Sequence, residues 1–285
     1  MCDDNNAWFR EKTPFEGGRS LGIKIKQKLV ETRSKFQKIE IYDTVSVGKM
    51  LVLDDVIQLT EADEFPYHEM FVHPAMNVHP DPKSVLVVGG GDGGVLREAN
   101  KYPGLERIDI CEIDGDVIEL SKQHLPFTAV GFADPRVKVY VDDGADFMKR
   151  MKGAYDLIMV DSSDPIGPAE VLFRQEFFET CKIALKPKGA IITQCESIFL
   201  HLHIIENVTA ACCKLFKHVE YMNVLLPTYP SGMIGQMVCS QGPAYSMPER
   251  QIPDAIQQTL KYYTPELHKA AFTLPRFAAQ KIHRQ

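Results

Sequence analysis

The sequence predicts an α/β protein with a mostly parallel sheet, preceded by a small antiparallel β domain. Over residues 8–60 apolar and polar residues alternate with a period of two, which is typical of half-buried antiparallel strands. Beyond about residue 65, short apolar runs alternate with helical stretches, the order expected when helices connect parallel strands. We therefore expect two domains, residues 1–65 and residues 66–285.

In the first domain, aliphatic residues two positions apart mark the expected strands. These pairs are Ile23 and Ile25, Ile39 and Ile41, and Leu51 and Leu53. A polar residue separates the members of the first two pairs, and Gly17-Gly18 and Gly48-Lys49 provide turns between the runs. The alternation places one face of each strand against a core and the other in solvent.

The second domain repeats a strand–helix pattern. The expected strands are residues 85–88, 107–111, 137–141, 157–161 and 190–193, followed by 219–225 and 234–240. The expected helices are residues 95–102, 115–124, 145–151, 175–185 and 202–215. Ligands of such sheets bind outside the carboxyl ends of the parallel strands, so the polar residues that follow each strand are the candidates for a site.

Composition excludes several classes of protein. The net charge is −6, 45% of residues are hydrophobic and 25% are charged, as in ordinary globular proteins and unlike disordered or collagenous chains. The acidic balance argues against a nucleic-acid partner. The seven cysteines form no CxxC pair, and no apolar run approaches the ~18 residues of a membrane span. We expect a cytoplasmic protein with reduced cysteines and no membrane anchor.

Two strand ends carry the signature of a nucleoside site. The glycine-rich segment 89–94 follows the first strand of the second domain, where glycines permit close approach of the backbone to a ligand. Glu112 ends the next strand about 20 residues further on, the spacing at which a carboxylate binds ribose hydroxyls. A structural turn and a carboxylate at a helix N-terminus are the alternatives. The paired spacing favours ribose binding for Glu112.

The next two strands also end in carboxylates. Asp143, followed by Gly144, is placed either to accept a hydrogen bond from an adenine amino group or to cap the next helix. The fourth strand ends in the segment 161–168, which contains Asp161 and Asp164, two prolines and a glycine. A purely structural turn seldom needs two aspartates three residues apart beneath a ligand cleft. This stiff acidic loop is therefore the most informative segment of the chain.

Asp92, inside the glycine-rich segment, discriminates between donors. S-adenosylmethionine carries a carboxylate on its tail, which Asp92 repels, whereas a decarboxylated donor ends in an ammonium, which Asp92 attracts. At an effective dielectric constant of about 20, unit charges ~4 Å apart interact by about 4 kcal/mol, enough to decide between them. A dinucleotide pyrophosphate is equally disfavoured beside this carboxylate.

The motifs at these positions resemble those of the polyamine aminopropyltransferases. They are VVGGGDGGVLRE, CEID, DDGADF, DSSDPIGPAEVLF, PTYPSG and HKAAFTLPRF, and the match runs from Trp8 to Phe277. The resemblance implies a class I methyltransferase-like, Rossmann-like domain behind an N-terminal β domain. It also implies transfer of an aminopropyl group from decarboxylated S-adenosylmethionine to putrescine, giving spermidine and methylthioadenosine. A homodimer, no metal and no cofactor beyond the donor are expected.

The resemblance also implies roles for single residues. Asp161 matches the residue that deprotonates the attacking amine, and Asp164 one that binds it. Tyr67 and Tyr229 match tyrosines of the amine pocket, and Tyr67 helps to position the amine. The positions that match donor-binding residues are Gln37, Gln58, His68, Asp92, Glu112, Asp143 and Gly144. The loop 161–172 resembles a gate that closes over both substrates.

Two positions depart from the family pattern. Phe15-Glu16-Gly17-Gly18 replaces a common Trp-Pro-Gly stretch, which puts the far wall of the amine pocket, and with it the exact amine, in question. His68 stands where many relatives carry Gln, and because both side chains form hydrogen bonds we expect little change from it. Spermidine as the acceptor stays open as an alternative, as do N-methylation of a diamine, against which Asp92 argues, and a relative that only binds ligands. Retention of both Asp161 and Tyr67 argues against the last, because binding alone needs no base.

Three further residues are weighed and given no firm role. Glu196 follows the fifth strand and either binds the distal end of an amine or is a solvated loop carboxylate. His201 and His203 are two residues apart and do not share a helix face, so we do not expect them to bind a metal.

Overall fold

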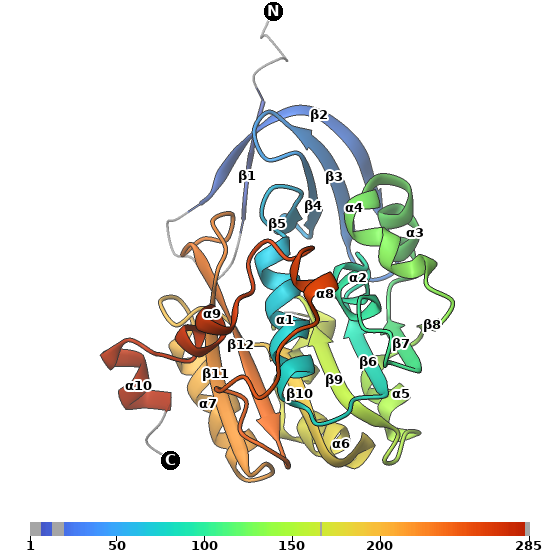
Figure 1. Cartoon of the computed structure of the whole chain (residues 1–285). Helices are drawn as coiled ribbons and strands as arrows, with labels where there is room; N and C mark the ends of the chain where they lie inside the picture. The colour runs from blue at the N-terminus through green and yellow to red at the C-terminus, as the bar shows by residue number, and fades with distance from the viewer. Residues whose placement is uncertain (1–6, 13–19, 166, 283–285) are drawn as a thin grey trace, which may run out of the picture.

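The computed structural model describes residues 7–12, 20–165 and 167–282, and it contains two sheets (Figure 1). The N-terminal sheet has the order β1-β2-β3-β4-β5, with neighbouring strands antiparallel. Its strands are β1 (Trp8–Arg10), β2 (Gly22–Arg33), β3 (Lys38–Thr44), β4 (Lys49–Leu53) and β5 (Val56–Thr60). The alternating pattern of residues 8–60 is therefore an antiparallel sheet, as predicted.

The second sheet has the order β11-β12-β10-β9-β6-β7-β8. Its strands are β6 (Ser84–Gly89), β7 (Arg107–Glu112), β8 (Val137–Val141), β9 (Tyr155–Asp161), β10 (Leu185–Gln194), β11 (His218–Leu225) and β12 (Met233–Ser240). Strands β6 to β10 pair in parallel, whereas β12 runs antiparallel to both β10 and β11. The mostly parallel, Rossmann-like sheet of the sequence analysis is confirmed. The chain reverses its direction of winding between β6 and β9, which is the switch point where such sheets bind ligands.

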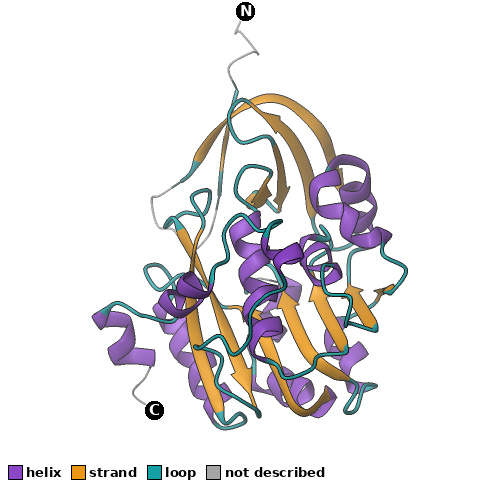
Figure 2. Cartoon of the chain, viewed as in Figure 1, coloured by secondary structure: helices purple, strands orange, loops and turns teal. Residues whose placement is uncertain are grey.

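Helices cover both faces of the second sheet (Figure 2). Those that the sequence predicts are α2 (Gly94–Asn100), α3 (Gly115–His124), α5 (Gly144–Lys149), α6 (Gln175–Ala184) and α7 (Leu202–Cys213). Those that it does not predict are α1 (Phe65–Val78), α4 (Pro126–Ala129), α8 (Asp254–Gln257), α9 (Pro265–Ala271) and α10 (Arg276–Ile282), with the 3₁₀ segments η2 (Val130–Ala133) and η3 (Gly167–Phe173). None of the described helices is long and apolar enough to cross a membrane.

Alternate residues of β6 show how the sheet is buried. Val85 and Val87 belong to the core beneath α1 and α2, and Leu86 and Val88 to the core beneath α5, α6 and α7. Each of these four side chains is at most 2% exposed. Because both faces are covered, the strand reads as a continuous apolar run, and polar groups are left to its carboxyl end.

Helix α1 joins the two sheets and carries candidate site residues in its first turns. The chain leaves the N-terminal sheet at Thr60, and the next helix begins at Phe65. Every residue of α1 from Pro66 onward is buried, so no amphipathic period is present to be read from its sequence. The boundary between domains at residue 65 stays a prediction.

A buried carboxylate fixes α1 against the C-terminal segment. Glu69, 1% exposed, accepts hydrogen bonds of 2.8 to 2.9 Å from the backbone N–H groups of Lys261, Tyr262 and Tyr263. Charged acceptors strengthen such bonds, and their loss leaves three backbone donors, of which that of Tyr263 is buried, without a partner.

We expect Glu69→Ala to lower the free energy of unfolding by about 3 kcal/mol, because the backbone donors at residues 261–263 lose their acceptor. Urea denaturation followed by circular dichroism measures this change. Glu266→Ala, at an exposed glutamate of α9, is the matched control and should shift stability by less than about 0.5 kcal/mol. An equal effect of the two substitutions would contradict the anchoring role.

Candidate functional site

A cavity of about 450 Å³ lies between the N-terminal sheet and the carboxyl ends of β6, β7, β9 and β10. Its walls combine apolar residues of the small sheet, such as Leu51 and Ile57, with the polar strand ends of the large one. The acidic residues that line it are Glu11, Asp54, Asp63, Glu64, Asp92, Glu112, Asp143, Asp161, Asp164 and Glu196. Among the described residues that line it, none is Lys or Arg. Such a cavity favours cationic ligands.

The glycine-rich segment crosses the end of β9 at contact distance. Gly89 and Gly90 have φ of +79° and +69°, and the N–H of Gly90 donates to the carbonyl of Asp161 at 2.9 Å. A Cβ on Gly89 would lie 2.1 Å from that carbonyl oxygen, so no other residue fits. The glycines are therefore required by the packing of two strand ends, in addition to any approach by a ligand.

Asp161 forms the centre of the site. Its Oδ1 accepts a hydrogen bond of 2.7 Å from the hydroxyl of Tyr67, which projects from α1. Burial first, and then the neighbouring carboxylate of Asp92, raise the pKa of Asp161 to about 6. A carboxylate with this pKa is ionised at neutral pH and is a stronger base than an exposed aspartate. The two residues that the sequence analysis treats as catalytic are thus in direct contact.

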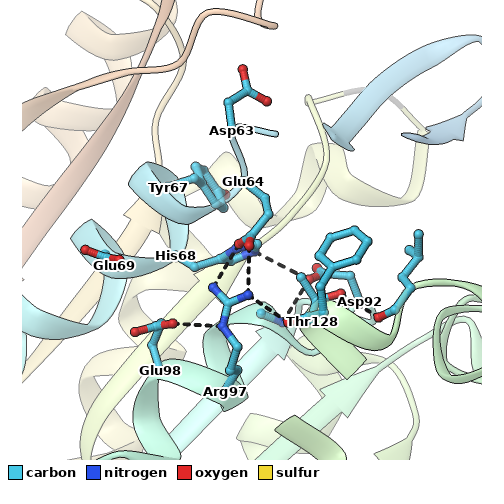
Figure 3. A network of polar contacts seen from close by, with 12 residues as sticks. Asp63, Glu64, Tyr67, His68, Glu69, Asp92, Arg97, Glu98 and Thr128 are labelled. Atoms are coloured by element: carbon cyan, nitrogen blue, oxygen red, sulfur yellow. Dashed lines mark hydrogen bonds and ion pairs between the residues drawn. The ribbon is translucent and has the colours of Figure 1, made fainter. Parts of the chain in front are cut away.

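Asp92 lies beside His68 at the N-terminus of α2 (Figure 3). Its Oδ1 accepts from the N–H of Gly94 at 2.8 Å and lies 3.4 Å from Nε2 of His68. The other ring nitrogen, Nδ1, lies 2.6 Å from Oε2 of Glu64. Burial lowers the pKa of His68, but Asp92 and Glu64 outweigh this effect and raise it to about 9. His68 is therefore an imidazolium at neutral pH.

Among the described residues, one group of side chains could hold a metal ion. One ligand atom each from His68, Asp92 and Asp161 lies within 4.8 Å of the others. A metal-bound imidazole must be neutral at the ligating nitrogen, whereas here each ring nitrogen faces a carboxylate. The expected absence of a metal stays a prediction.

Two of the predicted donor-binding residues, Glu112 and Gln37, share a carboxylate network. Glu112, at the end of β7, accepts from the N–H of Asp114 at 2.9 Å, and burial raises its pKa to about 7. Gln37 donates its side-chain amide to Asp114 at 2.9 Å, and Ser34 adds a bond of 2.6 Å. Gln37 and Glu112 both line the cavity, and Asp114 connects them, a link that the sequence analysis does not contain.

The remaining predicted donor residues also line the cavity. Asp143 accepts from the N–H of Asp146 at 3.0 Å and so caps α5, the helix-cap alternative of the sequence analysis. Gly144 follows it, and a Cβ there would lie 2.5 Å from Val88. Gln58, in β5, faces the cavity from the N-terminal sheet.

The predicted amine-binding residues Tyr229 and Asp164 line the same cavity. The hydroxyl of Tyr229 donates to the carbonyl of Gln58 at 2.7 Å, and its ring lies 6.5 Å from that of Tyr67, centroid to centroid. Asp164 is half-buried and lines the same cavity. Carboxylates and tyrosine rings thus surround one end of the cavity, where they suit an alkylammonium.

Glu196 is buried, so its description as a solvated loop carboxylate is wrong. It is 2% exposed, lines the cavity, and has φ of +57°, which is rare for a residue with a Cβ. Its carbonyl accepts from Tyr221 at 2.6 Å and from Gly235 at 2.8 Å, and its Oε2 lies 2.6 Å from Nδ1 of His201. Backbone strain held this firmly is typical of functional sites. The sequence signal that could have indicated a functional role for Glu196 is its position just after strand β10.

Two further segments bear on the predicted site, residues 15–18 and the loop 161–172. Phe15 to Gly18, the departure from the family pattern, lies outside the described residues. The loop expected to act as a gate contains the 3₁₀ segment η3, and its residues Ala169, Val171 and Leu172 line the cavity. Its closure over substrates stays a prediction.

Comparison with known proteins agrees with this geometry. Residues 64–249 match the spermine/spermidine synthase domain, and residues 7–61 match the spermidine synthase tetramerisation domain. The chain belongs to the spermine/spermidine synthase family. A spermidine synthase of Dictyostelium discoideum is 46% identical over 98% of both chains. Spermidine synthase 2 of Datura stramonium is 49% identical over 97% of this chain and 90% of its own.

Solved structures of the family share the fold. A spermidine synthase in complex with the transition-state analogue AdoDATO superimposes with a TM-score of 0.91 at 33% identity, covering 98% of this chain and 96% of the other. The spermidine synthase of Thermotoga maritima gives a TM-score of 0.88 at 32% identity. Membership of the family makes the chain an aminopropyltransferase. The tetramerisation domain indicates an oligomer, and a dimer in particular stays a prediction.

Proposed function

We propose that the protein is a spermidine synthase, which transfers the aminopropyl group of decarboxylated S-adenosylmethionine to putrescine. The observation that carries this proposal is the acidic cavity centred on the Asp161–Tyr67 pair, whose described lining contains no Lys or Arg. Both substrates are cations. The carboxylate tail of S-adenosylmethionine or the pyrophosphate of a dinucleotide would instead be repelled by Asp92. The curated relatives named spermidine synthase, at 46% and 49% identity, support the same substrates.

The donor occupies the side of the cavity nearest β7. Glu112 accepts from the ribose hydroxyls, and Gln37, in the loop between β2 and β3, and Gln58, in β5, line the cavity as further donor residues. Asp143 and the N–H of Gly144 border the adenine. The donor's ammonium lies beside Asp92 and His68, a position that a carboxylate-bearing tail would disfavour.

The acceptor occupies the side nearest Tyr229 and Asp164. A primary diamine is mostly protonated at neutral pH, because alkylammonium groups titrate near 10. Asp161 takes one proton from the reacting ammonium while Tyr67 orients the nitrogen. The freed lone pair then attacks the propyl carbon next to the sulfonium. A C–N bond forms, the C–S bond breaks, and methylthioadenosine leaves with the C–S electron pair, so no metal or covalent enzyme intermediate is needed.

Glu196 is placed to bind the distal ammonium of the diamine. Its carboxylate is buried in the cavity wall, and its Oε1 has no hydrogen-bond partner among the residues that the structure describes. A buried carboxylate oxygen in this state is stabilised when a cation reaches it. The distance between Asp161 and this group would then set the preferred length of the acceptor.

The direct test is release of methylthioadenosine by the purified protein from decarboxylated S-adenosylmethionine, with putrescine or spermidine as the acceptor. We expect kcat/KM for putrescine to exceed that for spermidine by at least about tenfold, equivalent to about 1.4 kcal/mol. A preference for spermidine would favour the spermine-forming alternative. Methyl transfer to putrescine from S-adenosylmethionine would overturn the donor assignment.

We expect Asp161→Asn to lower kcat by about 10²- to 10⁴-fold, because the amide cannot accept the proton of the reacting ammonium. Affinity for the donor, measured by calorimetry, should change less than about threefold. An equal loss of donor binding would show that Asp161 belongs to the donor site instead.

For Glu196→Gln we expect KM for putrescine to rise at least about tenfold, with a smaller change in kcat, since the distal ammonium loses its charged partner. Donor affinity is the internal control and should not change. Glu206→Gln, in the neighbouring helix α7 and outside the residues that line the cavity, is the matched variant and should behave as wild type. Unaltered KM in Glu196→Gln would refute the assignment.

A further inference from the structure

His68 is confined between two carboxylates from different elements (Figure 3). Its Nδ1 lies 2.6 Å from Glu64 and its Nε2 lies 3.4 Å from Asp92. A neutral imidazole has one N–H and one lone pair, so it can satisfy only one of these acceptors. Only the imidazolium presents an N–H toward both carboxylates, as a hydrogen bond to Glu64 and an ion pair with Asp92. The geometry therefore selects the charged form, although the ring is 2% exposed.

The partner at Nδ1 is itself held in the ionised state. Glu64 accepts two bonds from Arg97, at 2.7 and 2.9 Å, and the hydrogen bonds from His68 and Arg97 lower its pKa to about 2 against the effect of burial. Arg97 is fixed in turn by Glu98 at 2.8 Å and by the carbonyl of Phe127 at 2.9 Å. The Nδ1 side of the ring thus has a permanent, rigid acceptor.

The Nε2 side of the ring faces the cavity, where the charges around it change when a ligand binds. Asp92, from the loop before α2, and Asp161, from the end of β9, are the carboxylates there, and the hydroxyl of Tyr67 is bonded to Asp161. The backbone of Gly94 packs against the ring, since a Cβ at that glycine would lie 2.3 Å from Cε1 of His68. The ring cannot swing away, so its proton is the part that can change.

We propose that His68 is a cation in the ligand-free protein and that it loses its Nε2 proton when the donor's ammonium binds beside Asp92. The identity of that donor rests on the proposed function. The proton leaves to solvent, Nδ1–H keeps its bond to Glu64, and the Nε2 lone pair becomes an acceptor for the ammonium. His68 is then a positioning residue that favours the bound donor and adds no net charge to the cleft.

The reason is electrostatic. A second cation next to the imidazolium is repelled by about 4 kcal/mol at ~4 Å and an effective dielectric constant of about 20, and loss of the proton removes that cost. Between the pKa of His68 in the empty protein, about 9, and its lower value in the complex, binding releases a proton. Donor affinity therefore rises with pH across that window and levels off above about 9.

Calorimetry near pH 8 isolates this proton. At that pH Asp161, with a pKa of about 6, and Glu112, with a pKa of about 7, are already ionised, while His68 is still protonated. The donor is titrated into the protein in HEPES and in Tris, whose ionisation enthalpies differ, and the difference in apparent enthalpy gives the protons released. We expect close to one proton for decarboxylated S-adenosylmethionine. Methylthioadenosine, which lacks the charged tail, should release close to none.

The matched variant is His68→Gln, which carries no titratable ring. We expect it to bind the donor while releasing close to no protons, and to lose the pH dependence of affinity. His203→Gln, at an exposed histidine outside the residues that line the cavity, should release as many protons as wild type. A second measurement needs no variant: the logarithm of the wild-type association constant should rise with pH with a slope of about one between about pH 7.5 and pH 8.5.

The outcomes separate the two proposals. Donor binding with no proton release by the wild type, or with equal release by His68→Gln, would overturn the role of His68 and leave the proposed function standing. Failure of the wild-type protein to bind the donor would overturn both. A wild-type slope near zero with tight binding would contradict the inference even if His68→Gln cannot be purified.

Discussion

The site depends on the crossing of the glycine-rich segment over the carboxyl end of β9. That crossing is possible because Gly89 adopts φ of +79° and presents no Cβ to the carbonyl of Asp161. It brings Asp92 within reach of Asp161, whose pKa is raised by burial first and then by this neighbouring carboxylate. A side chain at Gly89 would separate the two strand ends and with them the two carboxylates. The proposed base and the proposed cation site thus both depend on this backbone contact.

Helix α1 supplies the other half of the constraint. It places Tyr67 against Asp161 and His68 against Asp92, and Glu69 on its next residue fixes the helix to the C-terminal segment. Three consecutive residues therefore serve two functions, two facing the cavity and one anchoring the element that carries them. The cost of burying these polar groups is offset by partners on other elements, as in the Glu64–Arg97 pair.

The sequence predicts the elements whose patterns are local. Both sheets, the helices between the parallel strands and the cluster of carboxylates at the strand ends follow from periodicity and from the rule that ligands bind at carboxyl ends. Helix α1 has no readable period because all its sides are buried. The contact of Glu196 with His201, and that of Gln37 with Asp114, depend on tertiary approach. Residue spacing does not encode the left-handed backbone at Glu196. Its burial also depends on tertiary packing, so both features are visible only in the structure.

Burial also resolves an apparent difficulty in the proposed chemistry. An exposed aspartate near pKa 4 is far too weak a base for an ammonium near 10. Burial raises the pKa of a carboxyl group and lowers that of an ammonium, because it disfavours the charged form of each. In the cavity the pKa of Asp161 is already about 6, and an amine enclosed beside it is moved in the opposite direction. Desolvation therefore narrows the gap from both sides, whereas the carboxylates around the amine act against it by favouring the ammonium. In the proposed reaction the carboxylates bind the cation, and its deprotonation depends on the exclusion of water from the cavity.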